Sequence, residues 1–361
     1  MDLHLLGSID AKDEPFAFGT QNHWFAMWRG GGLFRSSKVA FYNLAGTQPI
    51  RSVNQSSYSS PGNASTTTSV GYLAVDASAT RIAVCYKGSA SFAVPGFTFN
   101  VGLYDFASDR FVPCGGLSTR LPGPVGTLVA ALSPGGHMLA APSWHGNVLH
   151  LLDVDSAFDK NRKGDVPLVT LESGPRSRSY GIAWSPDGKL LAHFCDADPS
   201  PVLDLWRLPN GDDPDLMQAE SIGTARLEGK AGVSMSKPRA GLAFSPDSDL
   251  VAVGGLKKPY VFRLYSVSRG EFVADSVPLQ GEVSKLVFSP DGLHVFSGDV
   301  HGSIVVWRLD GIDRPSLVMS DSASVEGAVI GLDVDREMQS LCIASASNRT
   351  VSLHAAALPG S

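Results

Sequence analysis

Four segments of the chain repeat one pattern, in which two short apolar runs flank a Ser-Pro turn: AALSPGGHMLAA (130–141), IAWSPDGKLLAH (182–193), LAFSPDSDLVAV (242–253) and LVFSPDGLHVFS (286–297). The serines lie at positions 133, 185, 245 and 289, so successive turns are 52, 60 and 44 residues apart. Pro presets φ in such a turn, and Gly accepts the positive φ that completes the reversal. Repeats of this length, made of short strands, predict small sheets stacked side by side.

A second pattern follows each turn by about 20 residues. It is a short alternating strand, found seven times: VAFYNL (39–44), VGLYDF (101–106), VLHLLDV (148–154), VLDLWRL (202–208), VFRLYSV (261–267), IVVWRL (304–309) and VSLHAA (351–356). These strands resemble the WD-repeat family, whose third blade strand ends in Trp-Asp. The matching bulky positions are Tyr42, Tyr104, Leu152, Trp206, Tyr265, Trp307 and His354. Asp follows at Asp105 and Asp153, whereas Arg207 and Arg308 depart from the family pattern.

The repeat and the resemblance predict an all-β fold, a seven-bladed β-propeller of four-stranded antiparallel blades in a single domain over 1–361. The blades are expected at about 10–54, 70–115, 126–171, 179–227, 239–279, 282–319 and 326–356. The last range has room for three strands, so we expect the N-terminal segment LHLLGSI (3–9) to close this blade. Trp206 and Trp307 should then be buried between neighbouring blades.

Composition agrees with a loop-rich β protein. The chain has 361 residues, of which 43% are hydrophobic and 18% charged, and its formal net charge is −6, which argues against a general nucleic-acid coat. No apolar stretch approaches the ~18 residues of a membrane span, and the first residues do not form a secretory signal. Cys85, Cys114, Cys195 and Cys342 have no metal-binding spacing. We therefore expect buried, reduced thiols and a cytoplasmic protein, or a nuclear one if the source is eukaryotic.

No catalytic pattern is present in the sequence. The predicted innermost strands are apolar or small apart from Lys285 and Asp333, so a ring of metal ligands around the axis is not expected. The nine histidines show no ligand spacing, and GxSxG and P-loop motifs are missing from the sequence. The sequence thus predicts a protein that is not an enzyme and has no metal or cofactor site.

Long loops gather on one predicted face of the ring, where a rigid scaffold commonly carries function. They contain apolar residues such as those of KGSASFAVPGFTF (87–99), together with a basic arc formed by Arg29, Arg35, Lys38, Lys87, Arg120, Arg176, Arg178, Lys230, Lys237, Arg239, Lys257 and Lys258. Aromatic and Arg side chains often dominate protein interfaces. The candidate partner-binding residues are Phe34, Phe92, Pro95, Phe97, Trp144, Arg176, Arg178 and Tyr260.

The resemblance implies a non-catalytic scaffold for protein–protein interaction. We expect a monomer that joins one or more proteins in a hetero-complex through the long-loop face. The alternative is binding of nucleic acid or another anionic ligand, such as a lipid headgroup, through the basic arc on the same face. An enzyme is a third alternative.

Overall fold

The computed structural model describes most of the chain. The described residues are 1–10, 16–29, 38–44, 46, 48–54, 69–87, 99–113, 129–142, 148–159, 168–172, 178–209, 211, 213, 218–228, 240–311, 315–337, 339–347 and 350–359.

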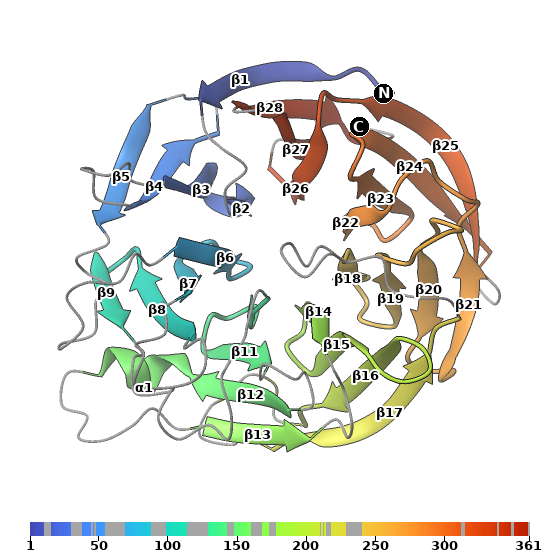
Figure 1. Ribbon diagram of the computed structural model, residues 1–361, viewed down its shortest axis with the longest axis horizontal. Helices are drawn as coiled ribbons and strands as arrows, with labels where there is room; N and C mark the ends of the chain where they lie inside the picture. Colours follow the sequence, from blue (N-terminus) through green and yellow to red (C-terminus); the bar gives the residue numbers. More distant parts are fainter. Residues whose placement is uncertain are drawn as a thin grey trace.

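Seven four-stranded antiparallel sheets form a ring, with the first strand of each sheet innermost (Figure 1). This architecture confirms the predicted seven-bladed β-propeller. Blade 1 contains β2 (Phe16–Gly19), β3 (Trp24–Arg29), β4 (Lys38–Asn43) and β5 (Pro49–Asn54), and blade 2 contains β6 (Ser69–Val75), β7 (Arg81–Lys87), β8 (Phe99–Asp105) and β9 (Arg110–Pro113). Blade 3 contains β10 (Ala131–Leu132), β11 (Met138–Pro142), β12 (Val148–Asp153) and β13 (Leu168–Glu172). Blade 4 contains β14 (Arg178–Trp184), β15 (Leu190–Asp196), β16 (Val202–Arg207) and β17 (Glu220–Arg226). Blade 5 contains β18 (Leu242–Phe244), β19 (Leu250–Val253), β20 (Arg263–Ser266) and β21 (Glu271–Asp275). Blade 6 contains β22 (Val283–Phe288), β23 (His294–Asp299), β24 (Ser303–Asp310) and β25 (Ser316–Ser324). Blade 7 contains β26 (Ala328–Asp335), β27 (Ser340–Ser347), β28 (Thr350–Ala357) and β1 (His4–Asp10).

The N-terminal strand completes blade 7, as predicted. β1 pairs antiparallel with β28, so the outer strand of this blade comes from the opposite end of the chain (Figure 1). Ser8 Oγ lies 3.1 Å from Ser352 Oγ across this pair. The N-terminal ammonium is 2.5 Å from a carboxylate oxygen of Asp321 in β25, which links blade 7 to blade 6.

Hydrogen bonds and backbone conformation within the turn explain why the Ser-Pro-Asp-Gly motif recurs. In blade 4 the Ser185 hydroxyl accepts a hydrogen bond from the Leu190 amide at 2.8 Å and donates to Asp187 Oδ1 at 2.6 Å. Gly188 adopts φ +71°, a left-handed conformation that favours glycine. In blade 5 Ser248 takes this place with φ +65°. The motif therefore fixes where the first strand of a blade ends and where the second begins.

One backbone hydrogen bond sets a common register for all blades. An amide at the end of the third strand donates to the carbonyl just before the second strand, as Leu208 does to Lys189 at 2.8 Å and Leu358 to Gln339 at 3.1 Å. Two residues before that amide stand Tyr42, Tyr104, Leu152, Trp206, Tyr265, Trp307 and Ala356. Six of the seven bulky positions inferred from sequence are confirmed. The prediction of His354 is wrong by two residues, because Ala356 occupies the equivalent position in blade 7.

The apolar cores lie between blades. Trp206 packs with Met138, Leu149 and Leu151 of blade 3, and Trp307 packs with Phe262 of blade 5 and neighbouring residues. The two tryptophans are 3% and 0% exposed, which confirms their predicted burial. Each blade is thus stabilised by the face of its neighbour.

Two short helices complete the described elements. They are the 3-10 turn η1 (Thr20–Asn22) and the five-residue α1 (Val154–Phe158). Among the residues that the structure describes, no helix has the length and apolar character needed to cross a membrane. Cys85, Cys195 and Cys342 are buried, as the sequence predicts.

Candidate functional site

Most of the partner-binding residues inferred from sequence lie outside the described part of the chain. They are Phe34, Phe92, Pro95, Phe97, Trp144 and Arg176. Arg178 is the first residue of β14. Tyr260 is half-buried between β19 and β20, and its carbonyl accepts a hydrogen bond from the Leu279 amide at 2.8 Å. The long-loop site stays a prediction.

A cavity of about 370 Å³ lies on the axis of the ring. It is lined by the inner ends of six blades, including Pro186, Pro246 and Pro290 of the repeated turns. Asp333 of blade 7 also borders it and accepts a hydrogen bond from Thr20 Oγ1 at 2.8 Å. Burial raises the pKa of the Asp333 carboxyl to about 6, despite the opposing hydrogen bond from Thr20. The cavity therefore contains a carboxyl group that titrates in mildly acidic solution.

A histidine bridge joins blades 1 and 7 beside this cavity. His23 Nδ1 lies 2.9 Å from Asp335 Oδ2, and His23 Nε2 lies 3.1 Å from Glu337 Oε2. The hydrogen bond to Glu337, followed by that to Asp335, raises the pKa of His23. The protonated imidazole can donate to both carboxylates, so the bridge is strongest when His23 is charged.

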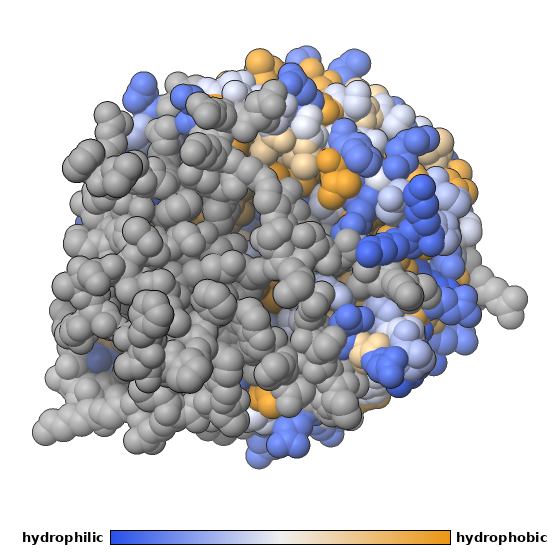
Figure 2. Space-filling model, viewed as in Figure 1, coloured by the Kyte–Doolittle hydropathy of each residue, from blue (hydrophilic) through white to orange (hydrophobic). Residues whose placement is uncertain are grey.

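Exposed apolar side chains lie on the circumference of the ring. Leu5 and Leu6 belong to β1 and Val318 and Met319 to β25, the outer strands of adjacent blades. We call these four residues the rim patch. Figure 2 shows hydrophobic surface along the upper edge of the view, where β1 lies in Figure 1. Leu5 is 62% exposed and Met319 is 56% exposed, so these side chains do not belong to the cores between blades.

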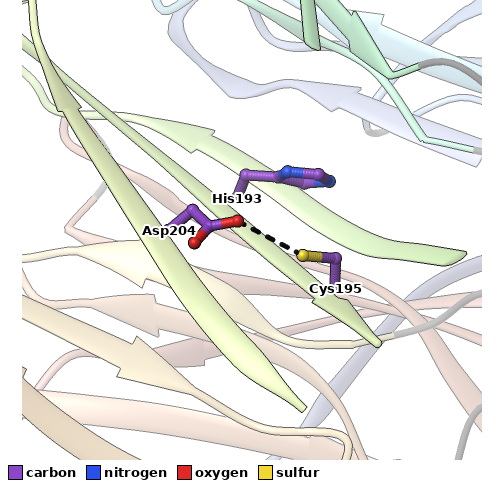
Figure 3. Close-up of side chains that lie close together, drawn as sticks. All are labelled: His193, Cys195 and Asp204. Carbon is purple, nitrogen blue, oxygen red and sulfur yellow. Dashed lines mark hydrogen bonds between the residues drawn. The ribbon is translucent and has the colours of Figure 1, made fainter. Parts of the chain in front are cut away.

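A group of three potential metal ligands is buried in blade 4. One ligand atom from each of His193, Cys195 and Asp204 lies within 4.8 Å of the other two. The thiol of Cys195 points toward the carboxylate of Asp204, with 3.6 Å between Sγ and Oδ2, and the His193 ring lies alongside (Figure 3). All three residues are at most 2% exposed. We call them the blade 4 cluster.

Strand pairing brings the blade 4 cluster together. His193 and Cys195 are two residues apart in β15, so their side chains share one face of the sheet. Asp204 of β16 stands directly opposite His193. Trp206 is on the same face, and its ring stacks on His193 with 6.1 Å between centroids. This face packs on blade 3, through the core that also holds Trp206.

Sequence reasoning missed the blade 4 cluster, although a signal was present. Asp204 is a charged residue inside the apolar run VLDLWRL, and His193 and Cys195 alternate with apolar residues in the preceding strand. A buried carboxylate needs partners, since an isolated charge in an apolar environment costs several kcal/mol. Combining that requirement with the strand register points to His193 and Cys195.

Comparison with known proteins agrees with the ring and its repeat. Residues 276–308 match the family described as WD40, "WD domain, G-beta repeat". This match covers β22, β23 and most of β24, including Trp307. The chain is a seven-bladed β-propeller, and its sixth blade matches the WD40 repeat.

A solved structure shares the fold of the whole ring. It is a chain in "Crystal Structure of Mitotic Checkpoint Complex", which aligns with a TM-score of 0.66 over 98% of this chain and 92% of that chain. The two sequences are 16% identical, so the likeness concerns the fold. No curated protein matches this sequence.

Proposed function

We propose that this WD-repeat propeller is a non-catalytic protein-interaction scaffold and a subunit of a multiprotein complex. The observation that carries the proposal is the exposure of large apolar side chains outside the cores between blades. The side chains of the rim patch are exposed, whereas the facing sides of blades 6 and 7 form a buried apolar core. Exposed hydrophobic patches often mark protein interfaces. A structural neighbour that lies in a protein complex supports the same function.

Two surfaces are candidates for the partner. The rim patch lies on the outer strands β1 and β25, whereas the long-loop face carries Phe92 and Phe97 of the sequence prediction. Outer strands also present unpaired backbone groups, which a partner strand can use. We propose that a partner binds at least one of these two surfaces. Substitutions on the surface that binds should weaken partner binding, and substitutions on the other surface should not.

Affinity purification from native extract, with quantitative mass spectrometry, tests the scaffold and separates the surfaces. The compared proteins are wild type, Phe92→Ala with Phe97→Ala, and Val318→Ser with Met319→Ser. Loss of an interface hot spot weakens binding by about 1–2 kcal/mol or more, or roughly tenfold in affinity. We expect one double variant to lose a reproducible set of partners while its Tm stays close to that of wild type.

The control variant is Leu293→Ser, which removes an exposed apolar side chain in the turn between β22 and β23. It should retain every partner. Equal partner sets for all variants would remove both surfaces from the proposal.

Salt dependence distinguishes the scaffold from the anionic-ligand alternative. Binding to phosphates weakens steeply with salt because counterions are released, whereas an apolar protein interface changes little. The variant Arg176→Glu with Arg178→Glu should slow partner association in a salt-dependent way and leave the final complex intact. Capture of nucleic acid that is lost in this variant and in high salt would contradict the scaffold proposal.

A further inference from the structure

We propose that the blade 4 cluster, His193, Cys195 and Asp204, is a zinc-binding site. The cluster combines an imidazole, a thiol and a carboxylate, which are the side chains that bind zinc in proteins. This mixture of ligands suits a borderline-soft ion better than Ca²⁺ or Mg²⁺, which prefer oxygen ligands. Three protein ligands are sufficient for zinc when water takes the fourth position.

The distance between the thiol and the carboxylate fits two ligands of one ion. Zn–S and Zn–O bonds of about 2.3 and 2.1 Å at a tetrahedral angle separate the two ligand atoms by about 3.6 Å. Cys195 Sγ and Asp204 Oδ2 are 3.6 Å apart. His193 brings its ligand atom within 4.8 Å of both, so small side-chain rotations are sufficient to place three ligands around one ion.

Two hydroxyl groups hold the ligands in place. Ser179 Oγ lies 2.8 Å from His193 Nε2, and Thr224 Oγ1 donates to Asp204 Oδ1 at 2.5 Å. The second bond leaves Oδ2 as the oxygen that faces Cys195. In metal centres an imidazole or carboxylate is usually oriented by such a hydrogen bond to its other polar atom. The surroundings of the cluster thus resemble those of a metal site.

Charge balance favours the ion at this depth. A zinc ion bound to a thiolate, a carboxylate and a neutral imidazole forms a complex with no net charge. Such a complex is compatible with the apolar core between blades 3 and 4, where an unbalanced charge would be costly. Binding releases the proton of the Cys195 thiol, and the thiolate forms the bond to the ion.

Burial of the site determines how the ion enters. His193 and Cys195 are 0% exposed, so the ion is acquired as the chain folds. The experiment therefore uses the full chain, both as purified and after unfolding with chelator and refolding in Co²⁺ or Zn²⁺. We expect about one equivalent of zinc per chain in the purified protein by elemental analysis. After refolding with Co²⁺ we expect visible bands of tetrahedral Co²⁺ and a near-ultraviolet thiolate-to-Co²⁺ band.

Matched variants identify the ligands. Cys195→Ser should lose the thiolate band, whereas Cys342→Ser, which removes a buried thiol of blade 7, should keep it. Thr224→Val removes the hydroxyl that orients Asp204 and should weaken Co²⁺ binding by about 10- to 100-fold. A thiolate band that persists in Cys195→Ser would contradict the assignment.

Wild type alone also tests the proposal, so the result does not depend on whether a variant folds. A ligand that binds the native state raises its stability. Refolding with Zn²⁺ should therefore raise Tm above that of the chelator-treated protein. Absence of zinc, of the Co²⁺ bands and of any change in Tm would overturn the proposal and leave a thiol–carboxylate hydrogen bond in its place.

Discussion

Blades 4 and 6 have the same backbone register but fill it with different buried polar groups. In blade 6, Trp307 donates its indole N–H to Ser297 Oγ at 2.8 Å. In blade 4, His193 stands where Ser297 does, and it stacks on Trp206. Asp204 takes the place that Val305 has in blade 6.

The difference shows that the repeat determines positions and leaves the chemistry of each position open. Blade 6 has Ser and Val at these positions, whereas blade 4 has His and Asp, which form a cluster of potential metal ligands with Cys195. The match to the WD-repeat family covers blade 6. A family match at one blade thus says little about what another blade buries.

Replacing the equivalent tryptophans of blades 4 and 6 with alanine should have the largest effect, and it tests whether the two blades share one backbone register. Trp206→Ala and Trp307→Ala should each lower the free energy of unfolding by about 3–5 kcal/mol, because each leaves a large cavity between blades. Urea denaturation of both variants measures this loss. A loss below about 1 kcal/mol at both positions would contradict the assigned register.

His150 in blade 3 sharpens the comparison, since it stands where Asp204 and Val305 do. It is 1% exposed, and neither ring nitrogen has a hydrogen-bond partner among the described residues. Burial lowers the pKa of His150 to about 4.

Because the pKa of His150 is lower in the folded protein than the unfolded value of 6.5, protonation of this residue does not affect stability above pH 6.5. The free energy of unfolding falls as pH drops below that value. The wild type should therefore lose about 3 kcal/mol through this residue between pH 7 and pH 4. His150→Leu should remove that loss, as measured by urea denaturation across this pH range. An unchanged pH profile in His150→Leu would show that the pKa of His150 is the same in the folded and unfolded states.

Asp333 tests the same idea at the axial cavity, where blade 6 has Val287 at the equivalent position. Its raised pKa means that the stability present in acid is lost as pH rises from about 4 to about 6. Asp333→Asn should raise the free energy of unfolding at pH 7 by about 3 kcal/mol. The gain should vanish near pH 3, and a gain of equal size at both pH values would exclude titration as its cause.

His23 should give the smallest effect, because its side chain is 38% exposed. Its raised pKa places the stabilising charge below pH 6.5, and the contribution is lost as pH rises through the folded pKa. His23→Gln should reduce stability in mild acid by under about 1 kcal/mol and leave alkaline stability unchanged. Chemical denaturation at pH 5.5 and pH 8.5 compares the two conditions, and a larger loss at the higher pH would refute the bridge.

The fold was predictable because its signals are local. A Ser-Pro turn is held by bonds within a few residues, such as that from the Leu190 amide to Ser185, so the motif marks two strands directly. In blade 7 the equivalent third-strand position is occupied by the small residue Ala356, so the pattern of bulky residues points to His354 instead.

The blade 4 cluster was harder to predict because it depends on pairing. His193 and Asp204 are 11 positions apart in the sequence, and only the register of β15 with β16 places them opposite each other. A shift by one residue would turn Asp204 to the other face. Spacing rules that look for ligands along one strand therefore cannot find such a site.

The pairing of β1 with β28 affects the order in which the protein folds during synthesis. Ser8 and Ser352 meet across 344 positions, so β1 has no partner strand until β28 has been synthesised. At about 5–20 residues per second, this strand waits roughly 20–70 s on the ribosome. Blades 1 to 6 can form in sequence during synthesis, while the ring itself can close only at the end. The newly made chain therefore passes through an open arc with two unpaired edges, and this is the stage at which it is most exposed to aggregation.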